Sequence, residues 1–281
     1  MTIGIGVLCS SKPRPFVPRP DAVILMADTM GSTETDSTPE LHKLYVEGKE
    51  NLFVVCAGRV ELASEVVSMF QRKMSNLPER SHGNIWNALN EAVHDHRMEH
   101  FRWDVVAARH SFSPGAVLQS QHDKLIEDWQ SYDPGLQMIV GTFDDSSMAL
   151  LYYVGQLYDV PGWVHSCEFP GFATIGSGAT NANCWLNFRH QQLGLNPRQS
   201  AYHAYEAKVM ASKAPTVNRN LELVIGFADR HYLLTEENAA MDGCPISMPE
   251  MKSMFKKYGP QETNELGHIK PSVSGTRKGG K

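Results

Sequence analysis

The chain has 281 residues, of which 42% are hydrophobic and 20% are charged, and its formal net charge is -5. These proportions are ordinary for a globular protein with a sizeable core, and they provide no basic footprint for nucleic acid. No apolar run approaches the roughly 20 residues that a membrane span requires, and the N-terminus lacks a signal-peptide pattern. The 5 cysteines form no C-x-x-C pair, which favours reduced thiols in a cytoplasmic protein.

The first half of the chain predicts strands followed by helices. Apolar runs bounded by turn residues predict strands at 3–9, 22–27, 44–46 and 52–58, the last two as a hairpin. Helical periodicity then predicts two helices, whose apolar faces carry Leu62, Val66, Met69 and Phe70 in the first and Ile85, Leu89, Val93 and His96 in the second. Residues 104–135 are interpreted as partly helical and partly loop.

The second half repeats this order. A hairpin at 136–143 and 148–154 and a strand at 172–175 lead into a Gly-Ser-Gly turn, which opens a helix reaching Phe188. Asn196 and Pro197 predict the start of a further helix with an apolar stripe of Tyr202, Tyr205 and Val209. Strands at 221–227 and 231–234 and a short helix at 249–257 follow.

This order of elements favours an α+β fold. Runs of strands separated by paired helices are satisfied by two face-to-face sheets with a helix pair outside each. The sequence shows neither an internal repeat nor a domain linker, so we expect one domain over residues 1–258 and a polar, disordered tail over 259–281.

The start of the chain carries the most specific chemistry. Thr2 directly follows Met1, and threonine is small enough for routine removal of the initiator methionine. That removal would place a hydroxyl and a free α-amine on the same residue, which is a nucleophile paired with its own base. The sequence therefore points to an N-terminal-nucleophile hydrolase.

Five short motifs extend this hypothesis along the chain. They are a Thr-x-x-x-Gly start, a strand ending in Ala-Asp-Thr, a Lys-hydrophobic step, an Ala-Gly turn and a Gly-Ser-Gly turn, in segments 2–6, 22–29, 42–45, 56–58 and 175–179. With these five motifs in this order, the chain resembles the proteasome β-subunit family, which includes the bacterial HslV-type and Anbu-type relatives. The resemblance implies a four-layer αββα sandwich of the N-terminal-nucleophile hydrolase type.

The resemblance also implies roles for five residues. Thr2 would be the nucleophile, and its α-amine the general base. Lys43 would favour the alkoxide, and Asp28 would hold the Lys43 ammonium in place. The backbone N–H of Gly58 would donate to the oxyanion, and Ser177 would help to orient the N-terminal amine.

The same resemblance implies a threonine-type endopeptidase inside a homo-oligomeric ring or stack of rings. Its substrate would be a peptide or an unfolded protein, and an ATP-dependent unfoldase is a candidate partner. The chemistry needs no organic cofactor, and neither nucleic acid nor membrane is an expected partner. Two alternatives stay open: a non-catalytic ring subunit, and a small-molecule amidase with the same nucleophile.

Two features bear on these alternatives. Many family members carry an Asp-x-x-Ser pair where this chain has residues 213–220, a stretch that includes Asn218 and contains no acid. This absence favours the non-catalytic subunit, whereas Thr2, Asp28 and Lys43 together argue against it.

Two further groups of residues have alternative interpretations. His94, His96 and His100, with Asp95 and Glu99, invite a metal site. We expect a polar helix face and no metal, because no matching ligand cluster with standard spacing lies nearby. Cys56 is expected to be a buried strand residue rather than a nucleophile.

Overall fold

The computed structural model describes residues 3–12, 19–28, 43–47, 51–107, 119–157, 160–212 and 221–260. The predictions for Thr2, for the stretch 213–220 and for the tail beyond residue 260 therefore lie outside the described residues. All other predicted elements fall within them, wholly or in part.

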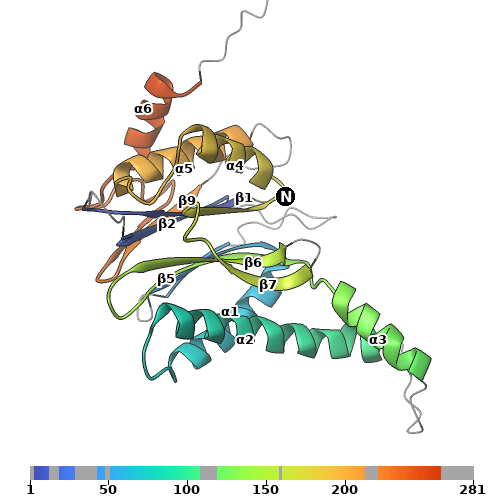
Figure 1. Cartoon of the computed structure of the whole chain (residues 1–281). Coiled ribbons are helices and arrows are strands. Elements are labelled where there is room, and N and C mark those ends of the chain that lie inside the picture. The colour runs from blue at the N-terminus through green and yellow to red at the C-terminus, as the bar shows by residue number, and fades with distance from the viewer. Residues whose placement is uncertain are drawn as a thin grey trace, which may run out of the picture.

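The described chain builds two antiparallel sheets that face each other (Figure 1). The first sheet has the order β10-β9-β2-β1-β8. Its strands are β1 (Ile3–Cys9), β2 (Ala22–Ala27), β8 (Phe172–Gly176), β9 (Glu222–Phe227) and β10 (His231–Leu234). The second sheet has the order β3-β4-β5-β6-β7. Its strands are β3 (Leu44–Glu47), β4 (Leu52–Gly58), β5 (Leu136–Phe143), β6 (Ala149–Leu157) and β7 (Val160–Ser166).

A pair of helices covers the outer face of each sheet. α4 (Ala179–Phe188) and α5 (Pro197–Ala211) lie over the first sheet, and α1 (Val60–Met74) and α2 (His82–Phe101) lie over the second (Figure 1). α6 (Met248–Tyr258) packs on α5, α3 (Gln119–Ser131) contacts β7, and a π-helical segment, η1 (Arg102–Ala107), continues α2. The predicted four-layer αββα sandwich is confirmed. No helix in the described ranges is both long and apolar enough to cross a membrane.

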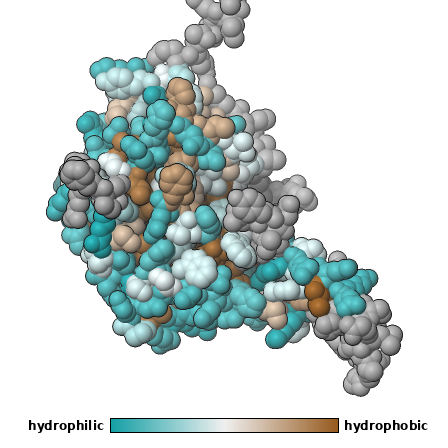
Figure 2. Space-filling model, viewed as in Figure 1, coloured by the Kyte–Doolittle hydropathy of each residue, from teal (hydrophilic) through white to brown (hydrophobic). Residues whose placement is uncertain are grey.

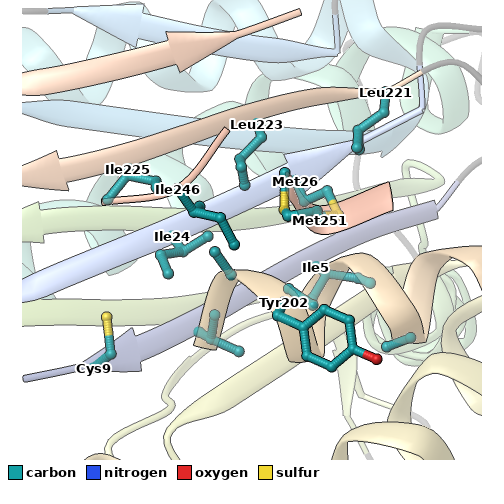
Figure 3. Close-up of a cluster of buried hydrophobic side chains, with 14 of the residues drawn as sticks. Ile5, Cys9, Ile24, Met26, Tyr202, Leu221, Leu223, Ile225, Ile246 and Met251 are labelled. Atoms are coloured by element: carbon teal, nitrogen blue, oxygen red, sulfur yellow. The ribbon is translucent and has the colours of Figure 1, made fainter. Parts of the chain in front are cut away.

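The buried side chains form three layers that follow the alternation of the strands. One face of β1 and β2 packs beneath α5, where Ile5, Ile24, Met26 and Tyr202 meet (Figure 3). The opposite face contributes Leu8 and Val23 to the layer between the sheets. A third layer joins the second sheet to α1 and α2. The face of the molecule seen in Figure 2 is mainly hydrophilic.

Glycines in β1 allow the two sheets to approach closely. A Cβ atom on Gly4 would lie 2.4 Å from Cγ1 of Val55 and 2.7 Å from Cγ1 of Ile175. A Cβ atom on Gly6 would lie 2.6 Å from Cγ2 of Ile139. The start of β1 is therefore pressed against the second sheet with no room for a side chain.

Two sequence predictions differ from the structure. The strand β7 was not predicted, because Pro161 and Gly162 lie within it; both residues disfavour central strands, and β7 occupies the edge of its sheet. The apolar stripe predicted for α5 is correct at Tyr202, but that helix buries mainly alanines together with Glu206 and Lys208. Glu206 is matched by Arg189, whose Nε and Nη2 atoms donate to the carboxylate at 2.6 and 2.5 Å.

The close approach at Gly4 yields a stability prediction. We expect Gly4→Ala to lower the free energy of unfolding by about 1–3 kcal/mol, because the added methyl group would overlap the buried, branched side chains of Val55 and Ile175. Gly83→Ala is the matched control, since nothing lies within 4 Å of its Cβ position. Urea denaturation of both variants measures the difference. Equal stabilities would show that the sheets can separate at little cost.

Candidate active site

A buried ion pair joins the two sheets where β2 ends and β3 begins. Asp28 directly follows β2, and Lys43 directly precedes β3. The Lys43 Nζ atom lies 2.9 Å from Oδ1 of Asp28, and the two side chains are 2% and 0% exposed. Taking both charges out of water is unfavourable, so the pair depends on close geometry and on further hydrogen bonds.

Asp28 also forms two hydrogen bonds with Ile3, the first described residue of β1. The Ile3 backbone N–H donates to Oδ1 of Asp28 at 3.2 Å, and the Asp28 backbone N–H donates to the Ile3 carbonyl at 3.2 Å. One carboxylate oxygen therefore accepts from both the Lys43 ammonium and the start of β1. The other oxygen, Oδ2, is buried and has no hydrogen-bond partner among the described residues.

Ser177 lies close to the same strand end through its neighbour. Ile3 pairs with Gly176 in the β1–β8 register, and Ser177 follows Gly176 and is exposed. The Gly176 N–H donates to Oε1 of Gln137 at 2.9 Å. Gln137 belongs to β5, so this hydrogen bond is a second link between the sheets at this end of the sandwich.

Gly58 ends β4 on the other side of that link. It pairs with Leu136, the neighbour of Gln137, and its φ angle is +86°. A Cβ atom there would lie 2.1 Å from the carbonyl oxygen of Gly135, so the backbone at this position requires glycine. Gly58 is exposed, which leaves its backbone reachable from solvent.

The structure thus brings four of the five predicted residues to one end of the sandwich. Asp28 and Lys43 are in direct contact, whereas Gly58 and Ser177 are connected to Ile3 through Gln137 and Gly176. The fifth residue, Thr2, lies outside the described residues.

Sequence reasoning missed three polar residues near this end. In the sequence, Gln137 is a polar residue within an apolar strand, and Lys208 is a lysine within a predicted helix; neither pattern indicates a functional residue. Lys208 is buried, and burial lowers its pKa to about 8 despite the attraction of the Asp28 and Glu236 carboxylates. Glu222, also buried, pairs across the sheet with Ala27, the residue before Asp28. No local spacing signals any of the three.

Cys56 also lies near Lys43 but is unsuited to nucleophilic chemistry. It is buried in β4, where its thiol donates to the Lys43 carbonyl at 3.6 Å. Burial raises the pKa of this thiol to about 11, partly offset by the Lys43 charge. Its identification as a buried strand residue is confirmed.

The ion pair predicts a large penalty for removing one partner. We expect Lys43→Met to lower the free energy of unfolding by about 3–5 kcal/mol, because it leaves the Asp28 charge buried without its counter-ion. Lys73→Met is the control. Lys73 pairs with Glu91 and Asp95 on the surface, where an ion pair contributes at most about 1 kcal/mol. Similar losses in both variants, measured by chemical denaturation, would contradict this account.

The cysteines predict a reactivity order. At pH 8 about one Cys56 thiol in a thousand is ionised, given its pKa of about 11. We therefore expect iodoacetamide to alkylate the exposed Cys184 in the folded protein and to leave the buried Cys56 and Cys167 unmodified until the chain is unfolded. Peptide mapping by mass spectrometry distinguishes the sites. Rapid modification of native Cys56 would contradict its assignment as an unreactive buried thiol.

The fold of the chain is similar to that of solved structures. No protein-family model and no curated protein matches the chain. An Anbu (Gly-1) mutant from Hyphomicrobium sp. strain MC1 is similar with a TM-score of 0.59 at 12% identity, over 92% of this chain and 94% of that chain. Anbu (ancestral beta-subunit) from Yersinia bercovieri is similar with a TM-score of 0.58 at 14% identity, over 92% and 93%. The chain therefore has the sandwich fold of these Anbu structures.

Proposed function

We propose that the chain is a threonine-type hydrolase that cleaves peptide bonds with Thr2 as its N-terminal nucleophile after removal of Met1. One observation carries the proposal: a single oxygen of Asp28 accepts both from the Lys43 ammonium and from the backbone nitrogen of Ile3. Residue 2 is covalently bonded to that nitrogen. The buried ion pair is thus hydrogen-bonded to the backbone nitrogen that follows the proposed nucleophile.

Covalent geometry supports this assignment. The two hydrogen bonds of 2.9 and 3.2 Å keep the Lys43 Nζ atom within about 6 Å of the Ile3 nitrogen. Consecutive Cα atoms are about 3.8 Å apart across a trans peptide, and this short reach from Ile3 supports the proposal that Lys43 acts on the Thr2 hydroxyl. A cation within about 4–6 Å of a hydroxyl would favour its ionised form.

The proposed reaction uses these groups in two steps. The α-amine takes the proton of the Thr2 hydroxyl, and the oxygen attacks the peptide carbonyl to form an ester while the amine product leaves with that proton. Water then hydrolyses the ester and restores the hydroxyl. The reference pKa of an α-amine, about 7.7–8.0, suits a base near neutral pH.

Two further residues complete the proposed site. The Gly58 N–H would donate to the oxyanion that forms in both steps, and one such donor contributes roughly 3–4 kcal/mol to the transition state. Ser177 would orient the α-amine. The contacts through Gln137 that join these two residues to Ile3 support the placement of both roles.

Assembly and substrate form the outer part of the proposal. The fold shared with Anbu (ancestral beta-subunit) favours a homo-oligomer that encloses its site. A peptide or unfolded protein is the proposed substrate, with an ATP-dependent unfoldase as a candidate partner and the cytoplasm as the proposed location. A non-catalytic ring subunit and a small-molecule amidase are the alternatives that experiments must separate.

The decisive experiment is intact mass spectrometry of the purified chain before and after reaction with a peptide electrophile directed at N-terminal threonine. We expect the mass to show loss of Met1, and a single adduct to form on Thr2. Thr2→Ser should keep the adduct, because the hydroxyl remains. Thr2→Ala should abolish both the adduct and peptide cleavage.

Three outcomes separate the alternatives. Retention of Met1, or a free Thr2 that never reacts, would overturn the proposal and favour the non-catalytic subunit. An adduct on Thr2 in a strictly monomeric protein that cleaves small amides but no peptide would favour the amidase. Light scattering during size-exclusion chromatography supplies the oligomeric state for this comparison.

A further inference from the structure

Three potential metal ligands converge on the outer helical layer, away from the ion pair of Asp28 and Lys43. Glu65 lies on α1, and His96 and His100 lie one turn apart on α2. One ligand atom from each residue falls within 4.8 Å of the other two. The helices α1 and α2 pack side by side below the second sheet (Figure 1), so the cluster spans the interface between two helices.

The two imidazoles both lie within hydrogen-bond distance of the same carboxylate oxygen. Nε2 of His96 lies 3.1 Å from Oε2 of Glu65, and Nε2 of His100 lies 2.8 Å from it. The two rings are 4.3 Å apart between centroids and are inclined by 40°. Both nitrogens therefore point to one small region, which is the arrangement that a shared ion requires.

We propose that Glu65, His96 and His100 bind a divalent metal ion, and that zinc is the preferred ion. Zinc binds imidazole nitrogens and carboxylate oxygens at about 2.0–2.2 Å, so tetrahedral ligands lie about 3.3–3.5 Å apart. The observed separations of 2.8 and 3.1 Å need to widen by only a few tenths of an ångström. Three protein ligands leave a fourth position for water.

The surroundings favour a cation over a simple hydrogen-bonded cluster. The His96 side chain is 2% exposed, so this proposed ligand is enclosed between the helices. The carboxylates of Glu61 and Glu99 lie within electrostatic range of Glu65 and His96, respectively. Glu65 is half-exposed, which provides an entry path for the ion from solvent.

An ion at this position would cross-link α1 to α2. The helix α1 begins two residues after Gly58, and α2 continues into η1, so the link would fix these two helices relative to each other. This role is structural and does not depend on the proposed hydrolase activity.

Metal binding by the full-length, tag-free chain tests the proposal. After treatment with EDTA and removal of the chelator, we expect the chain to bind one equivalent of Zn²⁺ by calorimetry and elemental analysis, with a rise in Tm. Co²⁺ should give the visible absorption of a tetrahedral nitrogen–oxygen site. Mg²⁺ should not bind, because it prefers an all-oxygen octahedral site.

The variants localise the ion. Glu65→Ala and His100→Ala remove partly exposed ligands and should lower zinc affinity by at least about 100-fold, more than loss of an outer-shell partner usually does. His94→Ala, an exposed histidine on the same helix, should bind like the parent chain. The proposal is overturned if the parent chain takes up no stoichiometric zinc, or if all three variants bind it equally. Neither result would bear on the reactivity of Thr2.

Discussion

The arrangement of the site depends on one buried carboxylate. Asp28 is fully enclosed, and an enclosed charge must be compensated at close range. Its compensation comes from Lys43, which precedes a strand of the second sheet, and from the backbone of Ile3 in the first sheet. Satisfying this single charge therefore fixes the relative positions of three chain segments: the start of β1, the end of β2 and the beginning of β3.

This constraint can act only because the sheets are close together. Gly4 and Gly6 have no side chains, so β1 approaches the second sheet until their Cα positions lie against Val55 and Ile139. The hydrogen bond from Gly176 to Gln137 then joins the sheets a second time at the same end. Backbone proximity and polar links thus support each other, and both would be lost if a bulky residue separated the layers.

The sequence predicted the parts of this fold that have local signals. Apolar runs bounded by turns predict strands because a buried strand needs nearly continuous hydrophobicity, and Asn196 with Pro197 marks a helix start through capping. The ordered short motifs predicted the αββα class, which the Anbu structures confirm at 12% and 14% identity. Neither edge strand β7 nor the alanine-lined buried face of α5 has such a signal.

Long-range contacts between polar residues could not be predicted locally. The distance between Asp28 and Lys43 depends on how two sheets stack, and only the family resemblance suggested that they meet. The histidines of α2 showed the same limit, since their carboxylate partner, Glu65, lies on a different helix. Residue type and spacing identify candidates within one element, whereas packing decides which elements meet.

The ion pair also bears on the choice between a catalyst and a scaffold. A buried ion pair is weak evidence for stability, because well-packed apolar residues of similar volume often serve a fold equally well or better. A scaffold therefore has no physical need for Lys43 and Asp28 at this position. In the proposed hydrolase, a fixed cation would favour the ionised form of the Thr2 hydroxyl, and the Lys43 ammonium is held by the same Asp28 oxygen that accepts from the Ile3 nitrogen. The unfavourable desolvation of the two charges thus occurs at the position where the proposed hydrolysis would use the cation.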